Sequence, residues 1–190
     1  MIERFFMVEE TALPKGRWFT GDFTSTDRED RRRLDRLEKC RGRFTIDPGF
    51  GGKALAFSLT AFGLPIATID LAEQVVQIAG EDVHLVPTDI AGYGEYRFIQ
   101  TLRELDCVDE SRSTFETFGD DAPSASMRGE HSAFTSLTLD AAKIPQDAHF
   151  FHVARWRLRP IVSRQVRETL EKGGILGVTF VDVNASKSYN

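Results

Sequence analysis

The spacing of apolar and polar residues over 149–183 predicts a strand, a helix and a second strand. Phe151 and Val153 alternate with other residues as one face of a short strand does. Val166 and Leu170 stand four positions apart, which places both on one face of a helix. The second strand is predicted from three apolar residues, Val178, Phe180 and Val183.

Both ends of the predicted helix carry signals. The hydroxyl of Ser163 can accept a hydrogen bond from a free N–H group of the first turn. Gly173 and Gly174 follow the last turn, where the backbone often needs a positive φ. Pro160 favours an extended conformation for Arg159, so the helix is expected to begin at Ser163 rather than earlier.

A similar pattern occurs 95 positions earlier in the chain. Pro65 and Thr68 there correspond to Pro160 and Ser163. The helix and strand positions match as well: Leu71 with Val166, Glu73 with Glu168, Val75 with Leu170, Val83 with Val178, and Leu85 with Phe180. We therefore predict a doubled strand-helix-strand unit, with a chance recurrence of common local signals as the alternative.

The remaining chain reads mainly as strands and turns, so the predicted fold class is α+β. Short strands are expected in one or two mixed sheets, with the two similar capped helices and a charged N-terminal helix. Further strand patterns occur at 4–9, 18–23, 96–105 and 134–139, and one helical turn is expected at 140–143.

A length of 190 residues suits one domain with a substantial core. Its expected parts are an N-terminal strand and charged-helix segment, the first repeat unit, a strand-rich middle, the second repeat unit and a tail, at 1–53, 54–90, 91–148, 149–183 and 184–190. Small polar residues at 119–131 predict a mobile surface loop within the middle part.

Residues 28–43 form the most charged run, with eight basic and four acidic residues, so the rest of the chain carries a net charge of −9. Only Leu34 and Leu37 offer an apolar stripe. Three consecutive arginines at 31–33 suggest a nucleic-acid arm. Interleaved acidic residues and the lack of aromatic residues for base stacking instead favour a solvated, salt-bridged helix and no nucleic-acid partner.

The composition argues against a membrane protein and against a metal or disulfide framework. No apolar run approaches the roughly 20 residues of a membrane-spanning helix, and Glu3, Glu9 and Glu10 interrupt the N-terminal segment. Cys40 and Cys107 lie far apart without a CxxC spacing. We expect a cytoplasmic protein without a metal or another cofactor.

Five segments share their order and spacing with a known family. They are LVPTDI at 85–90, YRFI at 96–99, LDCVD at 105–109, the stretch from Lys143 to the PIVS of 160–163, and GVTF at 177–180. Together they resemble immunity family eleven of bacterial polymorphic toxin systems, over about residues 55–183. The resemblance implies a non-catalytic cytoplasmic protein that binds and neutralises one cognate toxin. It does not name the toxin-contacting residues.

Many antibacterial toxins act on nucleic acids through basic clefts, so an acidic surface is the expected partner site. Asp109, Glu110, Glu116, Asp120 and Asp121 are the candidate residues. The simpler alternative is that these acids only keep the protein soluble.

A second class of function remains open on the residues alone. Arg155, Arg157 and Arg159 crowd the predicted loop before Ser163, and arginines beside a helix N-terminus can bind an anion or a nucleotide. An enzyme for phosphate-bearing substrates could use such a pocket. The sequence shows no nucleophile-base pair or metal-ligand cluster to support it, and Trp156 is better explained by packing.

Overall fold

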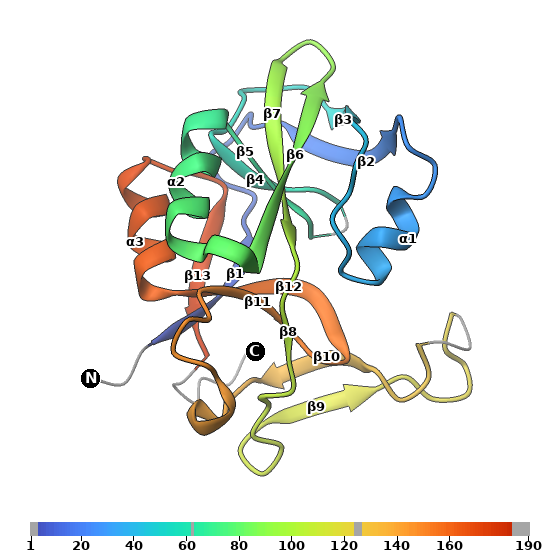
Figure 1. Ribbon diagram of the computed structural model, residues 1–190, viewed down its shortest axis with the longest axis vertical. Helices are drawn as coiled ribbons and strands as arrows, with labels where there is room; N and C mark the ends of the chain where they lie inside the picture. Colours follow the sequence, from blue (N-terminus) through green and yellow to red (C-terminus); the bar gives the residue numbers. More distant parts are fainter. Residues whose placement is uncertain (1–3, 62, 124–126, 184–190) are drawn as a thin grey trace.

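The computed structural model describes residues 4–61, 63–123 and 127–183, which form two mixed β-sheets and a smaller strand pair (Figure 1). One sheet has the strand order β2 (Phe19–Ser25), β3 (Phe44–Phe50), β6 (Val83–Ile90), β7 (Gly94–Thr101), β5 (Pro65–Ala67) and β4 (Phe57–Leu59). The second has the order β13 (Val178–Asp182), β1 (Phe5–Glu10), β12 (Trp156–Ser163), β11 (Phe150–Val153) and β8 (Glu104–Leu105). The strand pair consists of β9 (Thr114–Thr117) and β10 (His131–Ser136).

Helices are few and short. Within the described residues, the α-helices are α1 (Asp30–Asp35), α2 (Ile69–Ala79) and α3 (Arg164–Lys172), and η1 (Gly80–Asp82) and η3 (Ala141–Lys143) are single turns of 3-10 helix. The broad α+β class therefore holds, with strands predominating and both large sheets mixed.

α2 and α3 occupy equivalent places in the two sheets. α2 connects β5 to β6, and both strands pair antiparallel with β7, which lies between them. α3 connects β12 to β13, and both strands pair antiparallel with β1 between them. Each helix thus joins two strands that run in the same direction within one sheet.

The two helices pack side by side and turn their apolar faces into one buried core. Leu71 and Val75 of α2 and Val166 and Leu170 of α3 lie there with residues from both sheets. Burial of these side chains provides the main hydrophobic stabilisation where the sheets meet. At the C-terminal end of α3, a side chain on Gly173 would approach Leu71, so glycine permits the close contact of the helices.

Two buried charged residues also connect the sheets. Arg17 forms an ion pair with Glu10 at 2.7 Å and donates hydrogen bonds to the Ser58 hydroxyl and the Gly177 carbonyl. Asp82, directly before β6, accepts hydrogen bonds from the backbone N–H groups of His149 and Phe150 at the start of β11 in the other sheet, at 2.6 and 3.1 Å. These charges are buried with partners, as the cost of desolvation requires.

The predicted end signals of the second helix are confirmed. The Ser163 hydroxyl accepts a hydrogen bond from the Val166 N–H at 3.4 Å, and Gly174 has a φ of 67° just beyond the helix. Thr68 precedes α2, but its side chain makes no capping hydrogen bond, so the predicted hydroxyl cap of that helix is wrong.

The charged N-terminal helix is much shorter than the run at 28–43 predicts, because it is limited to α1. Leu37 has a φ of 56°, which interrupts helical geometry. The buried Asp30 carboxylate then accepts hydrogen bonds from the backbone N–H groups of Arg41 and Gly42, at 3.0 and 2.9 Å. A chain that returns to this carboxylate cannot continue as a straight helix.

The predicted loop before Ser163 is also wrong, because this segment is the strand β12. It lies between β1 and β11, with Phe5 opposite Ser163 and Phe150 opposite Val162. The exposed Arg157 and Leu158 made the segment resemble a loop, whereas its second half is buried.

Strands β3 and β9 were not predicted from the sequence. The predicted loop at 119–131 and tail at 184–190 include residues outside the described ones, at 124–126 and 184–190, and β10 already begins at His131.

Candidate interaction surface

The negative charge of the protein is concentrated in one segment. Residues 106–131 contain seven acidic and two basic residues, a net charge of −5, which equals the formal charge of the whole chain. The other residues balance at 22 acidic and 22 basic. The segment includes β9 and the start of β10, which lie at the far end of the molecule from the β6–β7 turn (Figure 1).

From residue 107 onward, this segment is part of a long antiparallel arm, which we define as the described residues within 107–140, namely 107–123 and 127–140. Its base is a bridge between Val108 and Leu139. The ladder continues through β9 and β10. Beyond the strands, the Phe118 N–H donates to the Glu130 carbonyl and the Gly129 N–H donates to the Phe118 carbonyl, both at 2.9 Å. Residues 119–123 and 127–128, the described part of the connecting loop, form the tip of the arm. Because Val108 and Leu139 are buried with β11 and β12 residues, the base of the arm belongs to the core.

A row of aromatic rings fixes the arm against β12. Phe115 of β9 and Phe134 of β10 each pack against His131, with centroid distances of 4.5 and 4.8 Å. Phe134 in turn meets Trp156 of β12 edge to face, at 4.9 Å. Burial, followed by the nearby positive charge of Arg155, lowers the pKa of His131, so the imidazole is neutral at pH 7. The arm is therefore held by an apolar contact and not only by its backbone connection.

The five predicted partner-binding acids all lie on this arm, but they do not converge. At the base, Asp109 accepts a hydrogen bond from the Ser111 hydroxyl at 2.6 Å, which is the main cause that lowers its pKa. Glu116 is exposed on β9. Asp120 and Asp121 are exposed in the tip loop. The acids thus give the whole arm a negative surface instead of forming one compact site.

The four residues of the predicted anion site are spread along β12. Arg155 lies in the turn before the strand, at a φ of 63°, and Ser163 is the last strand residue. At about 3.3 Å per residue, eight positions of an extended strand place them roughly 25 Å apart. The Ser163 hydroxyl is buried and engaged with the Val166 N–H and with His149 Nδ1, at 3.4 and 3.0 Å.

The three arginines have separate surroundings. Arg155 forms an ion pair with Glu110 at 2.8 Å. This pair links the predicted anion site, which includes Arg155, to the predicted partner-binding acids, which include Glu110. Arg157 contacts Glu104 through its Nε and donates from Nη1 to the Asp35 carbonyl at 2.6 Å. Arg159 lies in a different cavity from Arg157. The structure therefore does not bring these arginines together with Ser163.

A groove of about 630 Å³ runs beside the arm and was not predicted from the sequence. β1, β10 and β12 contribute to its walls, and its apolar lining includes Phe134, Trp156 and Leu158. Leu158 keeps 51% of its surface exposed. Its position between two arginines was the one sequence signal for an apolar surface here. The groove supplies apolar contact area directly next to the acidic arm.

Within residues 4–61, 63–123 and 127–183, no group of three or more His, Cys, Asp or Glu side chains is placed to hold a metal ion. None of the described helices is long and apolar enough to span a membrane.

Comparison with known proteins gives one family match. The model of the immunity protein family Imm11 matches residues 76–185, which is more than half of the chain. The matched part includes the whole arm, β12 and α3. No curated protein matches the chain.

Proposed function

The chain belongs to the immunity protein family Imm11, and from this membership we propose that it binds and neutralises a cognate bacterial toxin by direct protein contact. The family match carries the proposal, because immunity proteins protect a cell from a toxin. The protein acts by binding and not by catalysis. Its site of action is the cytoplasm, where a polymorphic toxin would reach its target.

We propose that the toxin faces the arm, with Asp109, Glu110, Glu116, Asp120 and Asp121 on or near the interface. The net charge of −5 on residues 106–131 supports this placement. A concentrated charge attracts an oppositely charged partner over about a Debye length and accelerates association. The expected partner therefore has a basic surface, as enzymes that act on nucleic acids commonly have.

Charge alone gives a fast encounter but little lasting affinity, so the interface also needs apolar contacts. The groove beside the arm offers them through Phe134 and Leu158. An apolar centre with a charged rim is the common arrangement of tight protein interfaces. We propose that the toxin covers this groove while its basic surface meets the arm.

The two strand-helix-strand segments are proposed to be copies of one unit within a single domain. Their equivalent connections support this: α2 and α3 each join two strands that flank a third, antiparallel strand. The unequal helix caps at Thr68 and Ser163 are then a later difference between the copies.

Co-expression tests the proposed function. The product of the neighbouring reading frame is expressed in a sensitive host with and without this protein, and growth is measured. Rescue of growth, together with a stoichiometric complex of the two purified proteins, is the expected result. A toxic product that this protein neither binds nor neutralises would contradict the proposal.

A further inference from the structure

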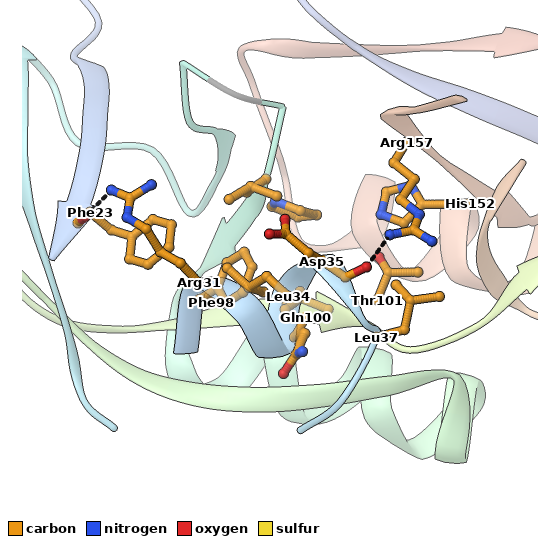
Figure 2. Close-up of a pocket in the computed structure, with 13 residues that line it drawn as sticks. Phe23, Arg31, Leu34, Asp35, Leu37, Phe98, Gln100, Thr101, His152 and Arg157 are labelled. Carbon is orange, nitrogen blue, oxygen red and sulfur yellow. Dashed lines mark hydrogen bonds between the residues drawn. The ribbon is translucent and has the colours of Figure 1, made fainter. Parts of the chain in front are cut away.

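A second cavity, of about 300 Å³, lies between α1 and the two large sheets (Figure 2). Its apolar lining includes Phe23, Leu34, Leu64 and Phe98. Ligand pockets in proteins start at about this volume. The cavity is thus large enough for one aromatic side chain and is separate from the groove beside the arm.

Two buried polar atoms of the lining residues have no hydrogen-bond partner within the described part of the protein. They are Thr101 Oγ1 and His152 Nδ1, and each residue exposes only 5% of its surface. Figure 2 shows both side chains at the same end of the cavity, close to Arg157. Buried polar groups are nearly always hydrogen-bonded, so two unpartnered atoms at one end of a cavity are a reason to look for a group that binds there.

The arginines and the glutamine around the cavity are already engaged, and the Asp35 side chain adds an exposed carboxylate to the lining. Arg157 binds Glu104 and the Asp35 carbonyl. Gln100 accepts from the Cys40 N–H and donates to the Glu38 carbonyl, at 3.0 and 2.6 Å. The polar end therefore favours a neutral ligand over an anion.

The available atoms define the ligand group more closely. Burial lowers the pKa of His152 to about 4, so the ring is neutral at pH 7, and it makes a hydrogen bond with the backbone of Arg159. A ring that donates to that backbone leaves Nδ1 as an acceptor, and the Thr101 hydroxyl can donate or accept. A single hydroxyl group on the ligand can satisfy both atoms, since it donates to one and accepts from the other.

We propose that this cavity receives a tyrosine side chain of the toxin, whose phenol donates to His152 Nδ1 and accepts from the Thr101 hydroxyl. The ring then packs between Phe98 and Leu34. Tyrosine is enriched among the residues that dominate binding at protein interfaces, because it combines an apolar ring with one polar atom. This inference rests on the proposed function and adds an anchor point at α1, apart from the acidic arm.

The chemistry of the cavity is tested first without the toxin. Binding of 4-methylphenol and of toluene is measured by NMR titration on the full chain. The wild type is expected to bind 4-methylphenol more tightly than toluene. Thr101→Val removes the hydroxyl with little change in shape. It should weaken the affinity for 4-methylphenol about tenfold and leave the affinity for toluene unchanged. Thr20→Val, a buried threonine away from the cavity, is the matched control and should change neither affinity.

The toxin is tested next with the same variants. Thr101→Val should weaken the complex about tenfold relative to Thr20→Val, and 4-methylphenol should compete with the toxin. No binding of 4-methylphenol overturns the cavity chemistry even when co-expression rescues growth. Equal toxin affinity of both variants overturns the tyrosine anchor but leaves the immunity function standing. If rescue fails while 4-methylphenol binds, the toxin assignment is overturned and a free phenolic molecule is the ligand.

Discussion

Arg155 and Glu110 form an ion pair, with 2.8 Å between the guanidinium Nη2 and the carboxylate Oε1. Arg155 occupies the β11–β12 turn and Glu110 lies at the base of the arm, so the pair connects the arm to the five-stranded sheet. The backbone adds a second link nearby, because the His131 N–H donates to the Arg155 carbonyl at 2.9 Å. Arg155 is thus better explained as a support of the arm than as part of an anion pocket.

The first prediction concerns the effect of this pair on His131. Arg155→Gln should raise the pKa of His131, because the positive charge of Arg155 disfavours the imidazolium. Glu110→Gln removes the opposite charge and should lower the pKa of His131, since the carboxylate favours the charged ring. In both variants the pKa should stay below 6.5, because burial is the larger cause. NMR titration of the ring protons measures these shifts.

Both partners are about half exposed, at 47% and 58%, so either substitution should cost no more than about 1 kcal/mol of unfolding free energy. Shifts of the His131 pKa in the same direction in both variants would contradict the electrostatic role of the pair.

The second prediction tests the acidic arm. Reversing Asp120 and Asp121 together to lysine should slow association with the toxin about tenfold at low salt and flatten its salt dependence. Glu73→Lys with Glu81→Lys produces the same charge change near α2, away from the arm, and is the control. Stopped-flow association at several salt concentrations measures both.

The tip reversal should leave the unfolding free energy nearly unchanged, since both aspartates are exposed. Equal slowing by the tip and control variants would indicate that only the total charge matters, and the arm would then not be the toxin-facing surface.

The sequence predicted elements best where a local signal coincided with burial. The helix beginning after Ser163 has a hydroxyl cap, two apolar residues on one face and glycines at its end, and its boundaries were recovered. The run at 28–43 has strong helical composition, but its fold is set by Asp30, whose carboxylate binds backbone groups eleven and twelve residues away. Such a long-range contact leaves no periodic pattern in the sequence.

The candidate surface was predictable only in part. The acidic residues of the arm could be identified from the sequence, whereas their position on one antiparallel element is seen only in the structure. The groove and the cavity could not be predicted, because each is formed by side chains from distant segments. Thr101 and His152, for example, are 51 positions apart and belong to different sheets. Their lack of a partner becomes visible only in three dimensions.

The third prediction compares the two helix starts. Ser163→Ala should destabilise the protein by about 1 to 2 kcal/mol, because it removes the cap on Val166 and the bond to His149. Thr68→Ala should cost less than about 0.5 kcal/mol through lost capping, since that hydroxyl makes no capping bond. Urea unfolding measures the difference. Equal losses would mean that the hydroxyl cap contributes little at either helix.

The last prediction is the pH dependence of stability that follows from His152. Its pKa is about 4 in the folded protein against 6.5 ordinarily, so acid favours the unfolded state, which takes up the proton first. The contribution of His152 to the free energy of unfolding is complete above pH 6.5 and is lost as the pH falls to about 4. The total loss is roughly 3 kcal/mol. Urea unfolding at pH 7, 6, 5 and 4.5 should therefore show falling stability.

His152→Gln removes this titration and should flatten the decline over that range, even if the variant is less stable at pH 7. His131→Gln should also reduce the decline of stability with falling pH, because the pKa of His131 is lowered as well. Neither substitution affects the carboxylates of Asp30 and Asp109, whose lowered pKa values make their contribution disappear only at more acidic pH. A slope that is unchanged in His152→Gln would mean that the ring is not neutral and buried in the folded protein, and the acceptor role of Nδ1 in the cavity would then be lost as well.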